Sequence, residues 1–389
     1  MATIATSALS VQAEPPPDLG QTALQVFLPR TGHTLGGTLL DYWRATGGAA
    51  VFGDPISEPF TAPDGRYSQA FENAILQYRP DVLYTEDPII RPMALPRTGE
   101  ATAADLLRPD RRRGGGGGTR RNIYSPVDPA GAAVAAAYAR GGRYDETTGH
   151  TLSGAFAAWY DANEGQFYFG GPTTEPIEEP DRIIQHFEGG ILIEDADGVR
   201  LAPIGQNLAT GLEVDTAPVA QNGLPVYDEA LFQTAPNPAP AGDPAAPGRR
   251  RIEVNVGQQQ LWAYQGETLV LTTLVSTGIE PNETELGRFR VRIKYPQQDM
   301  AGFTDDTGEV VAFGDDPELT PPPESVASYD VSDVPNVLYI NLDAEALHGA
   351  YWHANFGQRM SHGCINLPLE VAAFLYGWAP LGTEVWVHE

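Results

Sequence analysis

Cysteine and positive charge are scarce in this chain of 389 residues, and each shortage excludes whole classes of protein. The one cysteine, Cys364, cannot form an internal disulfide, a four-thiolate zinc site or a C-x-x-C redox pair. The 24 Lys and Arg are outnumbered by 51 Asp and Glu, and the net charge of −27 argues against nucleic-acid partners because phosphates repel it. No apolar run of about 18 residues occurs, so no transmembrane segment is expected.

Glycine and proline are abundant by contrast, at 42 and 34 residues, and they favour turns, linkers and short strands over long helices. Hydrophobic residues make up 42% of the chain, which is enough to build folded cores. A domain usually takes on the order of 100–200 residues, so the length predicts two or three domains. We therefore expect a multidomain α+β protein.

Residues 1–20 are interpreted as a residual leader or a disordered segment. Residues 2–13 are small and mildly apolar, and their end is similar to the small-x-small site at which signal peptides are cut. A basic first segment and a longer apolar run are both missing. The sequence thus predicts an extracytoplasmic protein, in the cell envelope or secreted, whose signal peptide is truncated or atypical.

The chain contains an internal duplication. The pentapeptide TGHTL at residues 31–35 recurs at residues 148–152, an offset of 117. A Phe-Gly-x-Pro turn and a pair of aromatic residues recur at the same offset, and a Gln-x-Phe-Glu motif recurs at an offset of 116. We assign repeat unit 1 to residues 21–100 and repeat unit 2 to residues 131–215. In each unit, helical spacing of apolar residues predicts one short helix, and two short strands follow it.

Each unit resembles the LGFP-like short repeats of cell-wall-associated proteins, through its Phe-Gly-x-Pro turn and its Phe-Glu strand. That resemblance implies that the units bind a cell-wall polymer or act as spacers. Trp43 and Trp159 are expected to be core residues of the units, and His33 and His150 turn or capping residues.

Two linkers are expected between the folded parts. Residues 101–130 contain a run of five glycines flanked by five arginines, which predicts a flexible basic loop. Residues 216–248 are rich in Pro and Ala and predict a stiff, extended spacer. The last domain is assigned to residues 249–389.

The last domain is predicted to be mostly β. Residues 251–256 alternate with a period of two, as a half-buried strand does, and a turn leads to a returning strand at residues 260–264. The remaining expected elements are four strands, at residues 268–276, 287–293, 337–340 and 383–387, and one helix at residues 369–378. Many short strands separated by turns favour a β-sandwich or an open barrel.

Cys364 lies in a polar, glycine-containing segment, whereas a thiol buried for packing usually lies in an apolar run. A cysteine nucleophile acts as the thiolate and needs a base or a cation nearby. Three histidines lie within sixteen residues of it. His348 and His362 are similar candidates for the base, although a turn at Gly363 mildly disfavours His362, and His353 is a weaker candidate.

The pattern His-x12-Ser-His-Gly-Cys-Ile-Asn, which begins at His348, resembles the catalytic domain of the L,D-transpeptidase (YkuD) family. The resemblance covers about residues 250–389 and includes the VSTG and GRF segments at 275–278 and 287–289. It implies the L,D-transpeptidase catalytic fold and, as partners, two peptidoglycan stem peptides, a donor and an acceptor. A cysteine attacks the donor between its third and fourth residues, the terminal D-amino acid leaves, and an acceptor amine takes the acyl group.

The same resemblance implies a role for each matching residue. Cys364 is the nucleophile and His348 the general acid/base, whose tautomer the backbone carbonyl of Gly349 holds. The N–H groups of Gly363 and Cys364 form the oxyanion hole. The residues expected to bind substrate or shape the site are Tyr339, Tyr351, Trp352, His353, Ser361, His362 and Asn366. Core packing stays open as the alternative role of the three aromatic residues, and neither a metal nor a cofactor is implied.

Residues 297–333 are acidic and proline-rich and are interpreted as a long loop. Such a loop is either a lid over the donor site, whose acidic rim favours an amine acceptor, or a solvated excursion.

Three functions are compatible with these residues. The first is a cysteine L,D-transpeptidase of peptidoglycan. The second is an L,D-carboxypeptidase, in which water replaces the amine and the same catalytic residues serve. The third is a non-catalytic wall-binding protein, for which a degraded motif would be expected, yet every motif residue is present.

Overall fold

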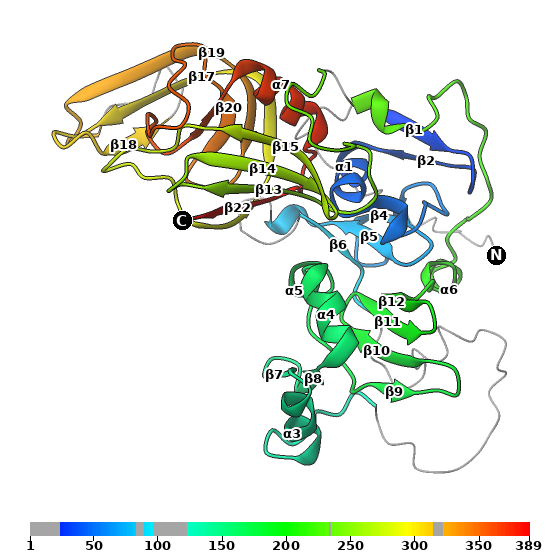
Figure 1. The fold of residues 1–389 in the computed structure, drawn as a ribbon. Coiled ribbons are helices and arrows are strands. Elements are labelled where there is room, and N and C mark those ends of the chain that lie inside the picture. Colours follow the sequence, from blue (N-terminus) through cyan, green and yellow to red (C-terminus); the bar gives the residue numbers. More distant parts are fainter. Residues whose placement is uncertain (1–23, 83–88, 96–122, 233–234, 314–321) are drawn as a thin grey trace, which may run out of the picture.

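The structure is a computed structural model that describes residues 24–82, 89–95, 123–232, 235–313 and 322–389. The expected leader at residues 1–20 and residues 101–122 of the Arg/Gly-rich linker lie outside these ranges. Figure 1 shows two smaller N-terminal units, coloured from blue to green, beside a larger β-rich part coloured from yellow-green to red.

The first unit begins with a hairpin and a helix. Strands β1 (Gln25–Leu28) and β2 (His33–Gly36) pair antiparallel, and β2 leads directly into α1 (Gly37–Ala45). The helix buries Leu39, Leu40 and Trp43, which recur at helical spacing. Two 3-10 turns, η1 (Gly48–Ala50) and η2 (Pro80–Val82), lie further along. The sheet of this unit has the order β3-β4-β5-β6, with bounds Phe60–Thr61, Tyr67–Ala70, Ile75–Tyr78 and Ile90–Pro92.

The second unit repeats this order of elements. A hairpin of β7 (Arg143–Asp145) and β8 (His150–Leu152) leads into α4 (Gly154–Ala162), and α5 (Gly165–Tyr168) follows. Its sheet has the order β12-β11-β10-β9, with bounds Gly198–Leu201, Gly190–Asp195, Ile183–Phe187 and Ile177–Glu178. Helix α3 (Ala132–Ala139) precedes these elements and α6 (Gly205–Gly211) follows them.

Equivalent residues of the two units make equivalent contacts. The Nε2 of Gln69 donates to the carbonyl of Thr34 at 2.7 Å, and Gln185 donates to the carbonyl of Thr151 at the same distance. Phe52 and its equivalent Phe169 pack against each other, with ring centroids 6.0 Å apart. Two buried apolar clusters contain residues of both units. The units therefore share their core, which compensates for the small core that each could build alone.

The two histidines of the repeated pentapeptide do not cap helices. His33 and His150 are each 1% exposed and are the first residues of β2 and β8. Their Nδ1 atoms lie 3.3 and 3.4 Å from the carboxylates of Glu58 and Glu175. Their burial beside a carboxylate fixes the start of each strand, so the expectation of turn or capping residues is wrong.

The described parts of the Pro/Ala-rich segment, residues 216–232 and 235–248, contact both neighbouring parts of the chain, which the prediction of a spacer did not include. The Tyr227 ring lies 5.0 Å from that of Trp43, and its N–H donates to the carbonyl of Phe27 at 2.9 Å. The 3-10 turn η3 (Glu229–Phe232) follows, and the N–H of Ala241 donates to the carbonyl of Val270 at 2.9 Å. Aromatic side chains between the prolines supply apolar surface to bury, which composition alone does not indicate.

The C-terminal domain consists of two five-stranded sheets and a helix. The first sheet has the order β15-β14-β13-β22-β16, with bounds Thr268–Leu274, Gln260–Gln265, Arg250–Asn255, Glu384–His388 and Gly287–Arg290. The second has the order β18-β17-β19-β20-β21, with bounds Val310–Phe313, Ile293–Thr304, Ala327–Tyr339, Ala346–Gly349 and Ile365–Leu367. The mostly β prediction for this domain is confirmed.

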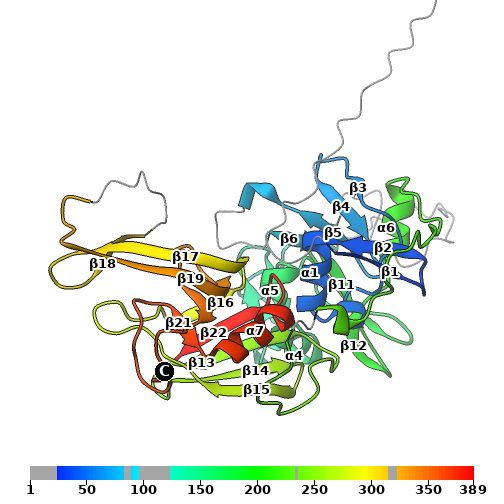
Figure 2. The same ribbon diagram turned by 90° about the horizontal axis from the view of Figure 1, so that it is seen from above.

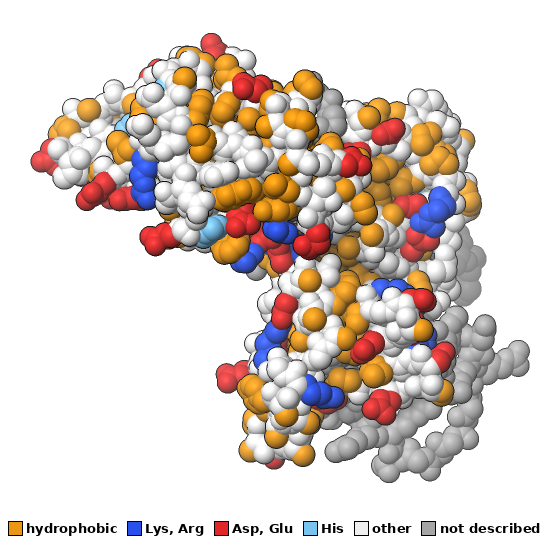
Figure 3. Space-filling model, in the orientation of Figure 1, with side chains coloured by type: hydrophobic (Ala, Val, Ile, Leu, Met, Phe, Trp, Pro, Cys, Tyr) orange, Lys and Arg blue, Asp and Glu red, His pale blue; other side chains and the backbone are white. Residues whose placement is uncertain are grey.

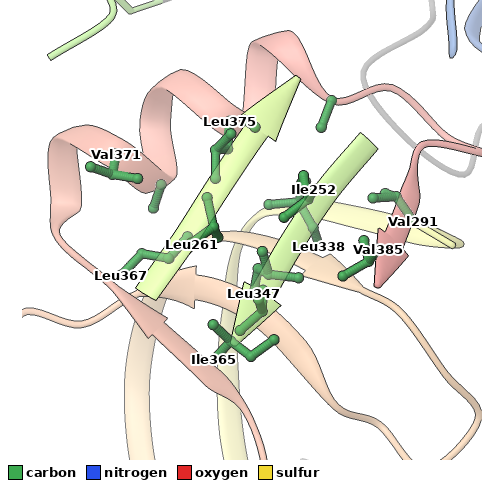
Figure 4. Close-up of a cluster of buried hydrophobic side chains, with 14 of the residues drawn as sticks. Ile252, Leu261, Val291, Leu338, Leu347, Ile365, Leu367, Val371, Leu375 and Val385 are labelled. Atoms are coloured by element: carbon green, nitrogen blue, oxygen red, sulfur yellow. The ribbon is translucent and has the colours of Figure 1, made fainter. Parts of the chain in front are cut away.

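The core of this domain lies between the sheets and beneath α7 (Leu369–Trp378). Figure 4 shows Val371 and Leu375 of the helix above Leu261, with Leu338, Leu347 and other strand residues completing the cluster. The helix has the predicted bounds, and Trp378 at its end is fully buried. Together these contacts fix the positions of β20 and β21.

The segment 297–333 is interpreted above as a long loop, but its described residues, 297–313 and 322–333, are largely strand. Strand β17 has 12 residues and β19 has 13, and they pair antiparallel along most of their length. Figure 2 shows this ribbon projecting away from the rest of the domain. Much of the surface of the ribbon is exposed to solvent, so its strands need few apolar residues. Without an apolar pattern, the acidic side chains and prolines of the segment suggested a loop.

Candidate active site

Adjacent parallel strands bring the two proposed catalytic residues together. In the register of β20 and β21, His348 lies opposite Asn366, and Cys364 immediately precedes β21. Both His348 and Cys364 line one cavity of about 310 Å³. This volume lies in the range of small-molecule sites.

His348 is buried and held in one orientation. Its Nδ1 lies 3.3 Å from the backbone carbonyl of Gly349, and since a carbonyl can only accept, Nδ1 carries the hydrogen. The Nε2 atom of the neutral ring is then a free base. Burial lowers the pKa of His348 to about 4, an effect that the hydrogen bond to Gly349 partly offsets and the charge of His353 reinforces. The imidazole is therefore neutral at physiological pH.

The thiol of Cys364 is also neutral at rest. The residue is half-buried, and its Sγ lies 3.9 Å from the backbone carbonyl of Ala344. Burial raises its pKa to about 12, the backbone N–H of Ala346 lowers it, and the nearby Glu345 carboxyl raises it again. Because the thiol and the imidazole of this cavity are both neutral, a nucleophilic attack by the sulfur would require proton transfer to accompany the attack rather than precede it.

At the turn that leads into Cys364, the backbone carbonyls accept hydrogen bonds from side chains, whereas the backbone N–H groups are free. Gly363 has φ of +118°, which side chains rarely tolerate. The Thr284 hydroxyl donates to the Gly363 carbonyl at 2.6 Å, and the Ser361 hydroxyl donates to the Cys364 carbonyl. In the described part of the chain, the N–H groups of Gly363 and Cys364 make no backbone hydrogen bond outside the strand ladder. Such free N–H groups are able to stabilise an oxyanion.

Asn366 and His353 form a polar pair at the site. The Asn355 N–H donates to His353 Nδ1 at 3.3 Å, so the neutral ring carries its hydrogen on Nε2. That Nε2 lies 2.8 Å from the Asn366 amide, while the Asn366 Oδ1 is buried without a partner. The chemistry favours the flipped amide, with its oxygen accepting from His353. The pair then orients Asn366, which lines the cavity, whereas His353 supports it from behind.

The other predicted site residues divide into two groups. Tyr339, Trp352 and His362 line the cavity with Cys364, and the His362 ring stacks on Tyr329 at a centroid distance of 5.1 Å. Tyr351 does not line it, because its hydroxyl donates instead to the backbone carbonyl of Ser332 at 2.6 Å. Tyr351 therefore ties the segment after β20 to β19.

The β17–β19 ribbon forms one wall of the cavity. Asp299, Met300 and Tyr329 contribute to this wall, together with Phe313 of β18. The apolar members suit an aliphatic chain, and Asp299 adds negative charge at the rim. Whether the ribbon moves as a lid stays a prediction.

Sequence reasoning missed three residues that shape the site, namely Thr284, Tyr329 and Glu345. Thr284 and Glu345 reach the nucleophile only through folding and give no local signal. Tyr329 did have one, because Ala327, Tyr329 and Val331 alternate with polar residues at a period of two. That alternation would have indicated a strand with one face toward the site.

Neither a metal cluster nor a membrane-spanning helix occurs among the described residues. No group of three or more His, Cys, Asp and Glu there could hold an ion. No helix in the same ranges is long and apolar enough to cross a bilayer.

Comparison with known proteins bears on the C-terminal domain. Residues 249–387 match the family profile described as the L,D-transpeptidase catalytic domain. This region has the L,D-transpeptidase fold. A Fuscovulum blasticum protein, provisionally named as an L,D-transpeptidase in the ATP synthase subunits region, is 28% identical over 161 residues, covering 37% of this chain and 83% of that protein. The LGFP-like resemblance of the N-terminal units stays a prediction.

Two solved L,D-transpeptidase structures align with the same region. The NMR structure of the E. faecium L,D-transpeptidase catalytic domain is 26% identical and covers 36% of this chain and 95% of that one, with a TM-score of 0.29. The Mycobacterium smegmatis L,D-transpeptidase is 19% identical and covers 36% of this chain, with a TM-score of 0.30. The alignment spans 60% of the length of the mycobacterial chain.

Proposed function

We propose that the C-terminal domain is a cysteine L,D-transpeptidase that cross-links peptidoglycan stem peptides in the cell envelope. The match of residues 249–387 to the catalytic-domain profile supports the reaction class. The observation that carries the proposal is the shared cavity of Cys364 and His348, with the His348 Nδ1 held by a backbone carbonyl. L,D-transpeptidases are typically envelope enzymes, and the location follows from the function.

The proposed acylation begins with the Cys364 sulfur attacking the carbonyl of the third residue of the donor stem. His348 Nε2 takes the thiol proton as the carbon–sulfur bond forms, and the N–H groups of Gly363 and Cys364 receive the oxyanion. The bond to the fourth residue then breaks, and His348 returns the proton to the leaving amine. The product is a thioester on Cys364 and a free D-amino acid.

Deacylation completes the proposed cycle. A neutral acceptor amine attacks the thioester carbonyl, and His348 Nε2 takes a proton from the nitrogen as the carbon–nitrogen bond forms. The carbon–sulfur bond then breaks, and His348 returns the proton to the sulfur to restore the thiol. If water attacks instead, the same residues release a shortened stem, and the protein is an L,D-carboxypeptidase. A tetrapeptide donor incubated with and without an added amine separates the two, because only a transpeptidase yields the cross-linked product.

Covalent labelling tests the proposal. Ertapenem acylates the E. faecium catalytic domain and is an electrophilic probe of the thiol. We expect one adduct on the full chain by intact-mass spectrometry, no adduct on Cys364→Ala, and slow labelling of His348→Gln. His388→Gln is the matched control, because His388 lies at the end of β22 and does not line the cavity. An adduct that persists on Cys364→Ala, or no adduct on the wild type, contradicts the proposal.

A further inference from the structure

A second, larger cavity lies between the second unit and the C-terminal domain. Its volume is about 880 Å³, and we call it the interdomain groove. Helices α4 and α5 line one side. Two loops of the C-terminal domain, residues 285–286 and 341–343, line the other side together with strand β16. Figure 3 shows the molecule hollowed where the lower lobe meets the upper one. The proposed reaction uses none of these residues.

Both loops lead directly from the groove to the nucleophile. Thr284 donates to the carbonyl of Gly363, and the next residue, Glu285, lines the groove. The carbonyl of Ala344 faces the Cys364 thiol, and the preceding residue, Asp343, lines the groove. Ala344 has φ of +61°, a conformation that residues with a Cβ rarely adopt, and such strain concentrates at functional sites. One residue therefore separates each groove loop from the catalytic turn.

Hydrogen bonds also connect the two loops to each other. The Glu345 carboxylate accepts from the N–H of Glu285 at 3.0 Å and from the Asn341 side chain at 3.0 Å. The same Asn341 amide donates to Glu285 Oε2 at 3.1 Å. These bonds hold the catalytic end of the groove in one shape.

The groove combines apolar surface with unpaired negative charge at this end. Each loop presents an exposed leucine next to an acidic residue, in the pairs Glu285-Leu286 and Leu342-Asp343; the leucines are 49% and 48% exposed. The three arginines of the groove all pair with carboxylates, Arg143 with Asp161, Arg288 with Glu384 and Arg290 with Glu164. Among the described residues, no arginine or lysine pairs with the two acidic residues of the loops.

We propose that the interdomain groove binds the acceptor peptide through a primary ammonium carried on an aliphatic chain. The chain packs on Leu286 and Leu342, and the ammonium is held by Glu285 and Asp343. This inference rests on the proposed transpeptidase function. After acylation the donor stays attached to Cys364 and occupies the smaller cavity, so the acceptor needs a separate approach to the thioester. Thr284 and Ala344, the sequence neighbours of the groove residues Glu285 and Asp343, contact Gly363 and Cys364, and the groove matches the acceptor in charge.

Binding without chemistry tests this assignment. The probe is a synthetic stem tripeptide whose third residue is lysine, titrated by calorimetry into the full chain carrying Cys364→Ala. Acetylation of the lysine amine is expected to weaken binding about tenfold, because it removes the charge that the acidic pair recognises. The double variant Glu285→Gln/Asp343→Asn is expected to weaken binding of the unmodified peptide about as much. Glu267→Gln, an exposed carboxylate outside the groove, is the matched control.

Three results would overturn the assignment: equal affinity for the acetylated peptide, unchanged affinity of the double variant, or no binding at millimolar peptide. The acetylation arm uses an unaltered groove, so it stands even if the double variant folds poorly. A second measurement uses the double variant with Cys364 intact. Relative to wild type, its ratio of amine transfer to hydrolysis is expected to fall by a larger factor than its rate of acylation by ertapenem. If ertapenem labels the protein but the groove variants transfer the acyl group at the normal rate, the acceptor assignment of the groove is refuted and the proposed function stands. If ertapenem does not label the protein, the proposed function itself is refuted.

Discussion

Replacing Glu229 by glutamine is expected to destabilise the protein by about 3 kcal/mol at neutral pH. Glu229 joins the N-terminal units to the C-terminal domain, because its carboxylate lies 2.5 Å from Arg44 and 2.6 Å from Arg250. Burial alone would raise its pKa, but attraction to Arg250 and Arg44 and their hydrogen bonds outweigh it and lower the pKa from 4.5 to about 2. Each pKa unit corresponds to about 1.4 kcal/mol, and the side chain is only 11% exposed, so solvent screening is small.

The pH dependence of this loss identifies its cause. A carboxyl whose pKa is lowered on folding contributes stability that is present above its unfolded pKa of 4.5 and is lost as the pH falls toward about 2. Urea unfolding followed by tryptophan fluorescence measures the difference between wild type and Glu229→Gln across this range, with the exposed Glu146→Gln as control. A difference below about 1 kcal/mol at neutral pH, or one that is unchanged near pH 2, would refute the ion-pair reasoning.

Two further predictions concern the catalytic turn. Burial raises the pKa of Glu345 to about 7, and its ionised carboxylate opposes negative charge on the Cys364 sulfur. Acylation of Cys364 by ertapenem is therefore expected to slow as the pH rises through about 7. Glu345→Gln should remove this inflection, and an unchanged pH profile in that variant would contradict the prediction. Gly363→Ala is expected to slow labelling more than about tenfold, since the new Cβ meets Glu345 Oε1 at 3.2 Å and φ is +118°. Gly308→Ala, also at positive φ but in open space, is its control, and equal labelling rates in the two variants would argue against the role of the turn.

The elements that were predictable from the sequence are those with a clear local period. Residues 251–256 alternate, and β13 forms there with a shift of one residue. The helical spacing of apolar residues identified one helix in each unit, α1 and α4, and α7 was also predicted with its observed bounds. The His-Gly and Ser-His-Gly-Cys segments pointed to His348 and Cys364, which both line the cavity, because closely spaced polar residues and glycine are uncommon in a packing segment. Strand β20, which carries His348, was not predicted.

The elements that could not be predicted depend on partners distant in the sequence. The ribbon of β17 and β19 is stabilised by pairing between its own strands, so its residues need no strong apolar pattern. The Pro/Ala-rich segment is held by the Trp43 ring, against which Tyr227 packs, and by the Val270 carbonyl, which accepts a hydrogen bond from Ala241; its own composition does not reveal either partner. Glu345 reaches the nucleophile only after β19 and β20 pair. Each miss therefore concerns a tertiary contact overriding a local tendency.

The same burial that forms the candidate catalytic cavity keeps His348 and Cys364 in their neutral forms, which under the proposed function would keep both groups unreactive until substrate binds. With His348 near pKa 4 and Cys364 near 12, very little thiolate exists at neutral pH, and a lone thiol in this state resists oxidation. In the proposed mechanism, attack becomes favourable only when a carbonyl lies next to the sulfur. The developing negative charge would then move to an oxyanion held by free N–H groups, while His348 would take the proton. Reactivity thus depends on the substrate that fills the cavity and completes the site. Selectivity and activation then share one physical origin, which explains how an apolar wall is compatible with a nucleophile whose pKa is so high.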